Sequence, residues 1–387
     1  MPLFEGTQVH HAERAFGADQ DLSIEALRGL AAILVLISHY VVLVRDGAGI
    51  WGMAATGVDL FFVLSGFVFA RSLGQTGWAV APYLLRRFFR LYPLYLLALL
   101  AYALLKPEEQ RWAAWWPHLF MLHTTGDLAL ASHYNVAFWS LPPEVEFYLV
   151  LPLLAGALAA FHRKRAAGLW CLLGLALLMK LGLVAQAYPG EPLDSFRTVL
   201  TVHLPGLLVE FLIGSAVAVA VGQVHSPHLG RAWPARQRST GAVCGLSMVL
   251  ILAVVYEQQL STPEAAAQAP LWLAGNFGLL VAVAFALLLL GRGRGLGLPS
   301  RASTAPPKPS LLPHLALWAG RLSYGVYLLH NAAPALLQRL WPEISGWPLV
   351  LSSVLLTLVA AWALHVWVEA PCRAYGRSWA SRWRAGA

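Results

Sequence analysis

The sequence predicts an all-α membrane protein, a polytopic helical bundle of about ten transmembrane helices. Hydrophobic residues make up 58% of its 387 positions and charged residues only 12%, whereas soluble globular proteins carry roughly 25% charged residues. The mean hydropathy is +0.61, and the apolar residues form blocks close to the ~20 residues that span a bilayer. These blocks are continuous runs of Leu, Ala and Val, without the alternation of a membrane β-barrel.

Ten apolar stretches account for the predicted helices. The third of them is short for a span, and the weakly apolar stretch 115–123 is expected at the membrane interface. The longest loop between spans on the outer side covers 106–145. The longest on the inner side, 292–313, is rich in Gly, Ser, Pro and Arg, which is typical of a linker. In chain order the spans are 28–44, 53–70, 91–105, 146–161, 167–187, 203–222, 240–256, 271–291, 315–331 and 349–367.

Lysine and arginine are distributed unevenly over the two sides of the predicted bundle. With the N-terminus in the cytoplasm, 19 of the 27 basic residues fall on the cytoplasmic side, 5 on the outer side and 3 within spans. This is the positive-inside pattern, and an even number of spans leaves both termini cytoplasmic. We therefore expect a cytoplasmic N-terminal segment at 1–27, a transmembrane domain at 28–368 and a basic cytoplasmic tail at 369–387, in a multi-pass protein of the cell inner membrane.

Several classes of protein lack support in the sequence. The net charge of +8 is spread over short segments between apolar blocks, so no single basic patch is available to bind nucleic acid. The three cysteines lack CxxC spacing, and His118, His123 and His133 lack the spacing of metal ligands, so we expect no metal site. P-loop, GxGxxG and HExxH motifs are absent, which leaves ATP-driven transport, dinucleotide chemistry and zincin chemistry without support.

Ionisable residues inside a span are costly and therefore indicate candidate functional sites. Arg28 and His39 are eleven residues apart in the first span, about three turns, which places them on one helix face roughly 16 Å apart. Asp59 of the second span lies at nearly the depth of His39, and the loop between these spans is short. A carboxylate beside an imidazole fixes its tautomer and raises its basicity. The sequence thus predicts a His39–Asp59 pair, with a snorkelling Arg28 and a purely structural Asp59 as the alternatives.

Two further groups of charged residues flank the spans. Arg87 and Arg90 are spaced i,i+3 on the cytoplasmic side, so one helix face presents two guanidiniums that could bind a phosphate. The alternative is a positive-inside anchor. Glu144 and Glu146 lie at the outer start of the fourth span, after two prolines that preset the first helical turn. Here the alternative is a carboxylate that only complements the helix dipole.

Three more ionisable residues lie within predicted spans: Glu210 in the sixth, His330 at the outer end of the ninth and His365 in the tenth. For each of them we expect a polar contact inside the bundle, where a buried polar group finds a partner. No internal repeat is evident along the chain, which disfavours a transporter built from inverted halves.

Taken in order, these residues resemble the motifs of the membrane acyltransferase-3 family, which includes bacterial surface-polysaccharide O-acetylases. The resemblance covers residues 24–371, nearly the whole chain. The two prolines before Glu144 depart from the small or aliphatic residues expected there. The six matching stretches are Ile24–Ala31 through His39, Gly57–Phe67, Arg87 to Arg90, Trp139–Tyr148, Leu322–His330 and Glu369 to Pro371.

The resemblance implies a ten-span enzyme that takes an acyl group, usually acetyl, from cytoplasmic acyl-CoA. The acceptor would be a hydroxyl of a glycan, a lipid-linked saccharide or another cell-envelope molecule, and neither a metal nor a nucleic acid would take part. His39 would either deprotonate the acceptor for direct attack or carry the acyl group itself. The implied site residues are His39, Asp59 and Glu144 for catalysis and Arg28, Arg87 and Arg90 for acetyl-CoA.

Two alternatives remain open at the level of the sequence. One is a polytopic transporter or flippase of glycolipid or polysaccharide precursors, in which Asp59, His39 and Glu144 form a proton path. The other is an O-acyltransferase that acts on a small molecule of the macrolide type. Acceptor-dependent release of CoA separates the enzymes from the transporter.

Overall fold

The computed structural model describes residues 22–73, 79–126, 128–160, 165–187, 196–221, 235–262, 265, 269, 271–291 and 311–385. Helices dominate this part of the chain, and it contains no strand. Eight of the described helices are long and apolar enough to cross a bilayer, and α13 adds a shorter apolar stretch, Gly275–Gly291. The prediction of an all-α polytopic membrane bundle is therefore confirmed.

A long helix coincides with each of the ten predicted spans. Shorter helices connect them, mainly between α4 and α7. The long helices are α2 (Leu22–Tyr40), α3 (Gly57–Leu73), α4 (Val80–Leu105), α7 (Leu141–Ala160), α8 (Arg165–Ala187), α10 (Leu204–Ala220), α11 (Ala235–Gln259), α13 (Leu271–Gly291), α14 (Leu311–Leu329) and α16 (Gly346–Leu364). The shorter ones are η1 (Val41–Leu43), η2 (Gly49–Thr56), η3 (Glu108–Gln110), α5 (Trp115–Leu119), α6 (Leu128–Ser132), η4 (Val136–Ser140), α9 (Phe196–Thr201), α15 (Ala332–Leu340), η6 (His365–Glu369) and α17 (Ala370–Ala385).

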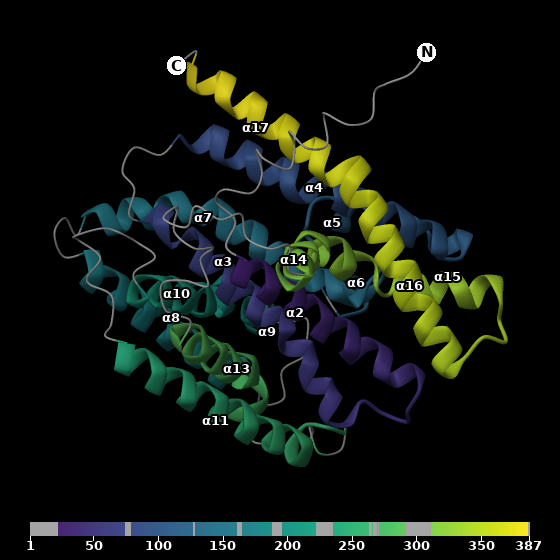
Figure 1. Cartoon of the computed structure of the whole chain (residues 1–387), viewed down its shortest axis with the longest axis horizontal. Helices are drawn as coiled ribbons and strands as arrows, with labels where there is room; N and C mark the ends of the chain where they lie inside the picture. The colour runs from purple at the N-terminus through teal and green to yellow at the C-terminus, as the bar shows by residue number, and fades with distance from the viewer. Residues whose placement is uncertain are drawn as a thin grey trace.

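The closest helix pairs are α3 with α10, α11 with α13, α2 with α14, and α4 with α17 (Figure 1). Glycines permit the first of these pairings. A β-carbon at Gly66 would collide with the backbone of Phe211, and one at Gly214 would collide with the backbone of Val63. Small residues let helices approach closely in a membrane, where packing rather than hydrophobicity holds them together.

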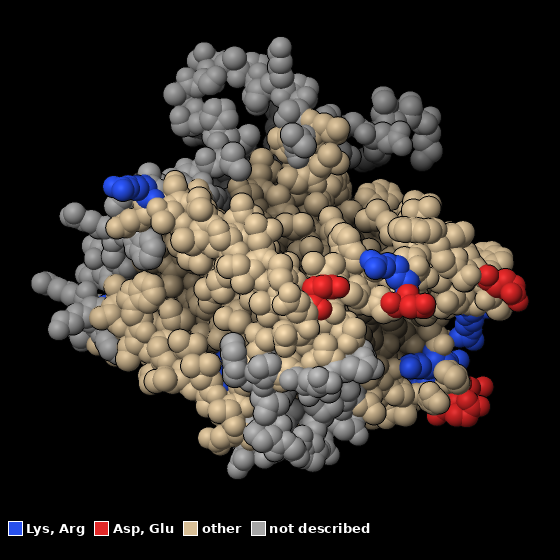
Figure 2. Space-filling view, turned by 90° about the horizontal axis from the view of Figure 1, so that it is seen from below, with Lys and Arg blue, Asp and Glu red and all other residues tan. Residues whose placement is uncertain are grey.

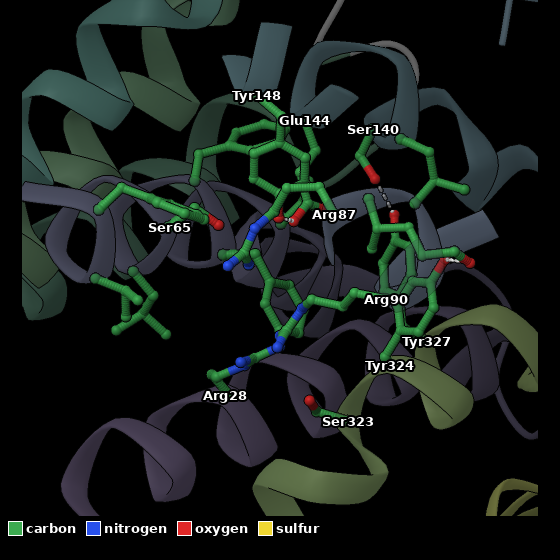
Figure 3. A pocket seen from close by; sticks show the side chains of 18 residues that line it. Arg28, Ser65, Arg87, Arg90, Ser140, Glu144, Tyr148, Ser323, Tyr324 and Tyr327 are labelled. Carbon is green, nitrogen blue, oxygen red and sulfur yellow. Dashed lines mark hydrogen bonds between the residues drawn. The ribbon is translucent and has the colours of Figure 1, made fainter. Parts of the chain in front are cut away.

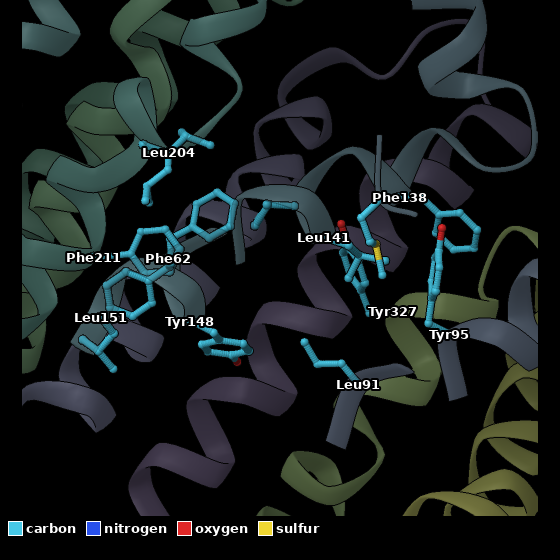
Figure 4. Close-up of a cluster of buried hydrophobic side chains, with 14 of the residues drawn as sticks. Phe62, Leu91, Tyr95, Phe138, Leu141, Tyr148, Leu151, Leu204, Phe211 and Tyr327 are labelled. Atoms are coloured by element: carbon cyan, nitrogen blue, oxygen red, sulfur yellow. The ribbon is translucent and has the colours of Figure 1, made fainter. Parts of the chain in front are cut away.

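A cluster of buried aromatic and aliphatic side chains lies between α3, α4, α7, α10 and α14 (Figure 4). The Phe147 ring stacks on Phe211 with centroids 4.1 Å apart, and the Phe62 ring lies 5.0 Å from that of Phe211. Aromatic pairs at these separations add to the stabilisation from burial. Tyr148 and Tyr327 belong both to this cluster and to the wall of a cavity, so the core fixes that wall.

The outer face of the bundle is largely uncharged. Figure 2 shows one face on which charged side chains are few and gather mainly toward one side. Large apolar side chains such as Leu153 and Leu178 are 71% and 68% exposed. A soluble protein rarely exposes so much contiguous apolar surface, whereas contact with lipid accounts for it.

Helix α4 is longer than the predicted third span. It begins at Val80 rather than at residue 91 and contains Pro93. The hydropathy of the added turns is low because they carry Arg86, Arg87 and Arg90, yet Arg87 and Arg90 turn toward a cavity inside the bundle. The helix therefore includes residues 80–90, which the hydropathy of the sequence does not assign to the span.

The predicted outer loop contains a segment that returns into the bundle. The Tyr95 hydroxyl donates to the His118 carbonyl at 2.7 Å, and the Tyr92 hydroxyl donates to the Leu119 carbonyl. Tyr92 lies about 20 Å along α4 from the end of that helix at Leu105. The segment around α5 therefore reaches the middle of α4, and Phe120 is 63% exposed.

Candidate active site

A cavity opens between α2, α3, α4, α7 and α14. Its wall is apolar where α3 contributes Phe61, Phe62 and Phe69. The polar side chains of the lining point into the same space (Figure 3). These are Arg28, Ser65, Arg87, Arg90, Ser140, Glu144, Tyr148, Ser323, Tyr324 and Tyr327.

Three guanidiniums dominate the electrostatics of this cavity. Arg28 comes from α2, and Arg87 and Arg90 come from successive turns of α4, as the i,i+3 spacing predicts. Arg90 lies close enough to both of the others to repel them. Among the described residues, none of the three forms an ion pair with a carboxylate within 4.0 Å. Like charges held together in this way favour binding of an anion.

Aromatic rings hold Arg87 in place. Its guanidinium carbon lies 4.7 Å from the centre of the Phe69 ring and 5.7 Å from those of Tyr83 and Tyr148, within range of cation–π attraction. Its Nε atom is buried and has no hydrogen-bond partner among the described residues. A buried donor without a partner is costly, so the site fits a ligand that carries acceptor oxygens, such as a phosphate.

Glu144 faces the guanidiniums from α7. That helix begins at Leu141, so both prolines lie in its first turn, where their missing N–H groups cost nothing. The Tyr148 hydroxyl, one turn further on, donates to Glu144 Oε1. The two prolines differ from the residues expected in the family motif, yet Glu144 still lies in the cavity wall.

Glu146 is only two residues from Glu144, but it contacts α10 and the residue before it instead of the cavity. It accepts a hydrogen bond from His203 Nδ1 and another, at 2.8 Å, from the backbone N–H of Leu204 at the start of α10. Two positions on a helix differ by about 200° in direction. Of the two glutamates, Glu144 lines the cavity and Glu146 ties α7 to α10.

His39 lies beyond the lining of the cavity and contacts a second histidine. The centroids of the His39 and His330 rings are 4.9 Å apart, and the His330 ring lies 6.1 Å from that of Tyr327 in the cavity wall. Arg28 shares its cavity with Ser323 and Tyr324 of α14. Both Arg28 and His39 thus face α14, as their spacing on one helix face predicts.

The environment of His330 fixes its tautomer. Its Nδ1 lies 2.8 Å from the carbonyl oxygen of Tyr327, which can only accept, so Nδ1 carries the proton and donates it. Its Nε2 is then an acceptor, and it is buried without a partner in the part of the chain that the structure describes. The Tyr40 hydroxyl donates to the His330 carbonyl at 2.6 Å. We had expected His330 to be a polar contact within the bundle, and it is one that reaches His39.

The predicted pairing of His39 with Asp59 is wrong. Asp59 has Lys180 of α8 and Glu210 of α10 as its charged neighbours and packs directly against Gly278 of α13. Within the described residues, no hydrogen bond or ion pair joins it to His39. Val58 lines the cavity, and the next residue is rotated by about 100° away from it. The proposed orienting role of Asp59 thereby loses its geometric basis.

The sequence analysis assigned no role to the tyrosines of α14. The Tyr324 hydroxyl donates to the Leu91 carbonyl at 2.9 Å, and the hydroxyl oxygens of Tyr327 and Ser140 are 2.6 Å apart. Both tyrosines line the cavity. Their i,i+3 spacing in the stretch Leu322–His330 was the available signal, because it places two hydroxyls on the helix face that also carries His330.

The model of a known family covers most of this chain: one described as an acyltransferase domain matches residues 21–366. The chain belongs to the acyltransferase-3 family. Among curated proteins, this membrane acyltransferase is 26% identical to Acyltransferase MdmB of Streptomyces mycarofaciens over 391 residues, 92% of each chain. It is 41% identical over 81 residues to Protein 2 in picA locus of Rhizobium radiobacter, which covers 20% of this chain and 40% of that protein. No solved structure matches it.

Proposed function

We propose that this acyltransferase moves an acyl group, in the simplest case acetyl, from cytoplasmic acyl-CoA to a hydroxyl of a glycan or another cell-envelope molecule. The observation that carries the proposal is the set of three guanidiniums that share one cavity without carboxylate partners within 4.0 Å among the described residues. A thioester donor with several phosphate groups suits such a set of charges. The protein would act in the inner membrane of the cell.

The placement of the arginines supports a donor that arrives from the cytoplasmic side. Arg28 lies in the second turn of α2, and Arg87 and Arg90 lie in the second and third turns of α4. Both helices begin on the side that the distribution of basic residues assigns to the cytoplasm. Arginine binds phosphate in a bidentate manner, so Arg87 and Arg90 would hold the pyrophosphate while the pantetheine arm extends toward His39.

The reaction requires a base near the thioester. In the direct route, a ring nitrogen of His39 takes the proton of the acceptor hydroxyl, and the oxygen attacks the thioester carbonyl. The carbon–sulfur bond breaks, and the thiolate leaves and takes up the proton, which gives the ester and free CoA. In the relay route, a ring nitrogen of His39 first attacks the thioester carbonyl, the carbon–sulfur bond breaks, and the CoA thiolate leaves and takes up the N–H proton of the ring. The acceptor hydroxyl oxygen then attacks the acyl carbon, the carbon–nitrogen bond breaks, and the ring takes up the hydroxyl proton. His330 is the residue that contacts the His39 ring in either route.

The transporter alternative loses its proposed path. It requires Asp59, His39 and Glu144 to exchange protons, yet Glu144 lines the cavity while Asp59 lies among α8, α10 and α13. A small-molecule acceptor remains compatible with the same cavity and the same chemistry.

The test is acceptor-dependent release of CoA from acetyl-CoA by membrane vesicles or by the purified protein. We expect release in the wild type and its loss in His39→Ala and Arg28→Ala at equal expression. Arg321→Gln is the matched control, because that guanidinium lies 5.4 Å over the Trp318 ring and outside the cavity lining. Retained release in His39→Ala, or proton-coupled uptake without thioester cleavage, would contradict the proposal. Mass spectrometry of envelope glycans with and without the gene would identify the acceptor.

A further inference from the structure

The C-terminal helix α17 covers the part of α4 that carries Arg87 and Arg90. The Phe89 ring of α4 lies 5.3 Å from that of Tyr375 and 5.9 Å from that of Trp379. A β-carbon at Gly376 would meet Phe89, so α17 approaches α4 closely at this point. In Figure 1 the two helices lie side by side. The predicted basic tail is thus, over its described residues, a helix packed against the part of α4 that lines the cavity.

A buried carboxylate at the start of α17 fixes an arginine there. Glu369 is 4% exposed and ends the π-helical turn that joins α16 to α17. It accepts hydrogen bonds from His365 Nδ1 at 2.8 Å and from the guanidinium of Arg373 at 3.2 Å. Such π turns are frequent at functional sites. Glu369 therefore holds the first turn of α17 in one orientation with Arg373 attached to it.

Arg373 brings a fourth guanidinium to the arginine cluster. Arg90 and Arg28 both lie close enough to repel it. The carboxylates whose charges act on Arg28 or Arg90 are Glu25, Glu144 and Glu369. Glu369 is already bonded to His365 and Arg373. Arg373 therefore adds positive charge beside Arg28 and Arg90.

We infer that Arg373 binds the 3′-phosphate of CoA beside the cavity, with Glu369 as its positioning residue; this inference rests on the proposed function. CoA carries a pyrophosphate in the middle of its length and a separate phosphate on the ribose, at the end remote from the thioester. Arg87 and Arg90 line the cavity, whereas Arg373 lies outside the lining on another helix. With the thioester directed toward His39, the remote end of the donor falls beside α17.

Binding of CoA and of 3′-dephospho-CoA to the purified full-length protein tests this inference. Arg373→Gln is expected to weaken CoA binding about tenfold, the scale of one charge-assisted contact, and to leave the affinity for 3′-dephospho-CoA unchanged. Arg87→Gln is expected to weaken both ligands, because both contain the pyrophosphate. Arg382→Gln is the matched control on the same helix, because its side chain is exposed and donates to the Ser378 carbonyl at 3.4 Å. This variant should bind both ligands as the wild type does.

Two further variants separate recognition from folding. Glu369→Gln should lower the preference for CoA without affecting 3′-dephospho-CoA. Arg373→Lys keeps the charge and should keep part of the preference, even if Arg373→Gln does not fold. If Arg373→Gln loses affinity equally for both ligands, or loses none, the inference is overturned while the proposed function stands. If the wild type binds neither ligand, both fail together.

Discussion

At the scale of single residues, the direction in which a side chain points from its helix determines whether it lines the cavity. Its depth along the membrane normal matters less. Glu144 and Glu146 are neighbours in sequence, yet one lines the cavity and the other ties α7 to His203 on α10. The sequence predicts nearly equal depths for Asp59 and His39, but the charged neighbours of Asp59 are Lys180 and Glu210. A hydropathy profile orders residues along the membrane normal and contains no information about which neighbour a helix face meets.

Arg87 gives the first prediction at this scale. Because its contact with the donor would form on binding and persist through the reaction, Arg87→Gln should raise KM for acetyl-CoA about tenfold or more and change kcat much less. Arg87→Lys should recover part of this loss, because lysine keeps the charge but not the bidentate geometry. Steady-state kinetics of CoA release measures both. A fall in kcat at unchanged KM would show that Arg87 acts only in the transition state.

Two stacked histidines of the returning segment give a prediction about pH. Burial lowers the pKa of His118 to about 3 and that of His123 to about 4, and their rings lie 4.2 Å apart. An unfolded histidine has a pKa near 6.5, so the unfolded chain binds protons that the folded chain excludes. The stabilisation is therefore complete above about pH 6.5 and is lost progressively as the pH falls toward 3–4.

Thermal unfolding in detergent between pH 7.5 and pH 4.5 measures this effect. The double variant His118→Gln, His123→Gln should show a flatter dependence on pH than the wild type. Equal slopes in the two proteins would show that these histidines are not neutral in the folded state.

At the scale of elements, the helices whose composition is uniform were predictable and those of mixed composition were not. The ten spans follow from runs of Leu, Ala and Val. The first turns of α4 and the whole of α17 were read as loop and tail, because Arg86, Arg90 and Arg377 lower the local hydropathy. A hydropathy average over a window of residues contains no information about packing between helices, such as the contact between Phe89 and Trp379.

The contact between α3 and α10 gives the prediction at this scale. Gly66→Ala places a methyl group against the backbone of Phe211 and should lower stability by about 1–3 kcal/mol, as overpacking does. Gly156→Ala on α7 is the matched control, because nothing lies within 4 Å of its added β-carbon. Thermal unfolding of the purified proteins compares them. An unchanged midpoint in Gly66→Ala would mean that the two helices are less closely packed.

At the scale of the whole molecule, the bundle brings together two regions: the cavity lined by arginines and the contact between His39 and His330. Different parts of the sequence predict them. The arginines of α2 and α4 line a cavity near the ends of those helices assigned to the cytoplasm. His39 lies further along α2, with His330 between it and the cavity wall formed by Tyr327. The motifs predicted the arginines and the histidine, whereas the tyrosines of α14 lie in an apolar run in which their i,i+3 spacing was the one signal of a shared polar face.

The most direct measurement is a structure of the full-length protein in a membrane mimetic with CoA bound. We expect the pyrophosphate to lie against Arg87 and Arg90 and the thiol to extend along α2 toward His39. CoA bound elsewhere, or bound in this cavity with its thiol directed away from His39, would contradict it.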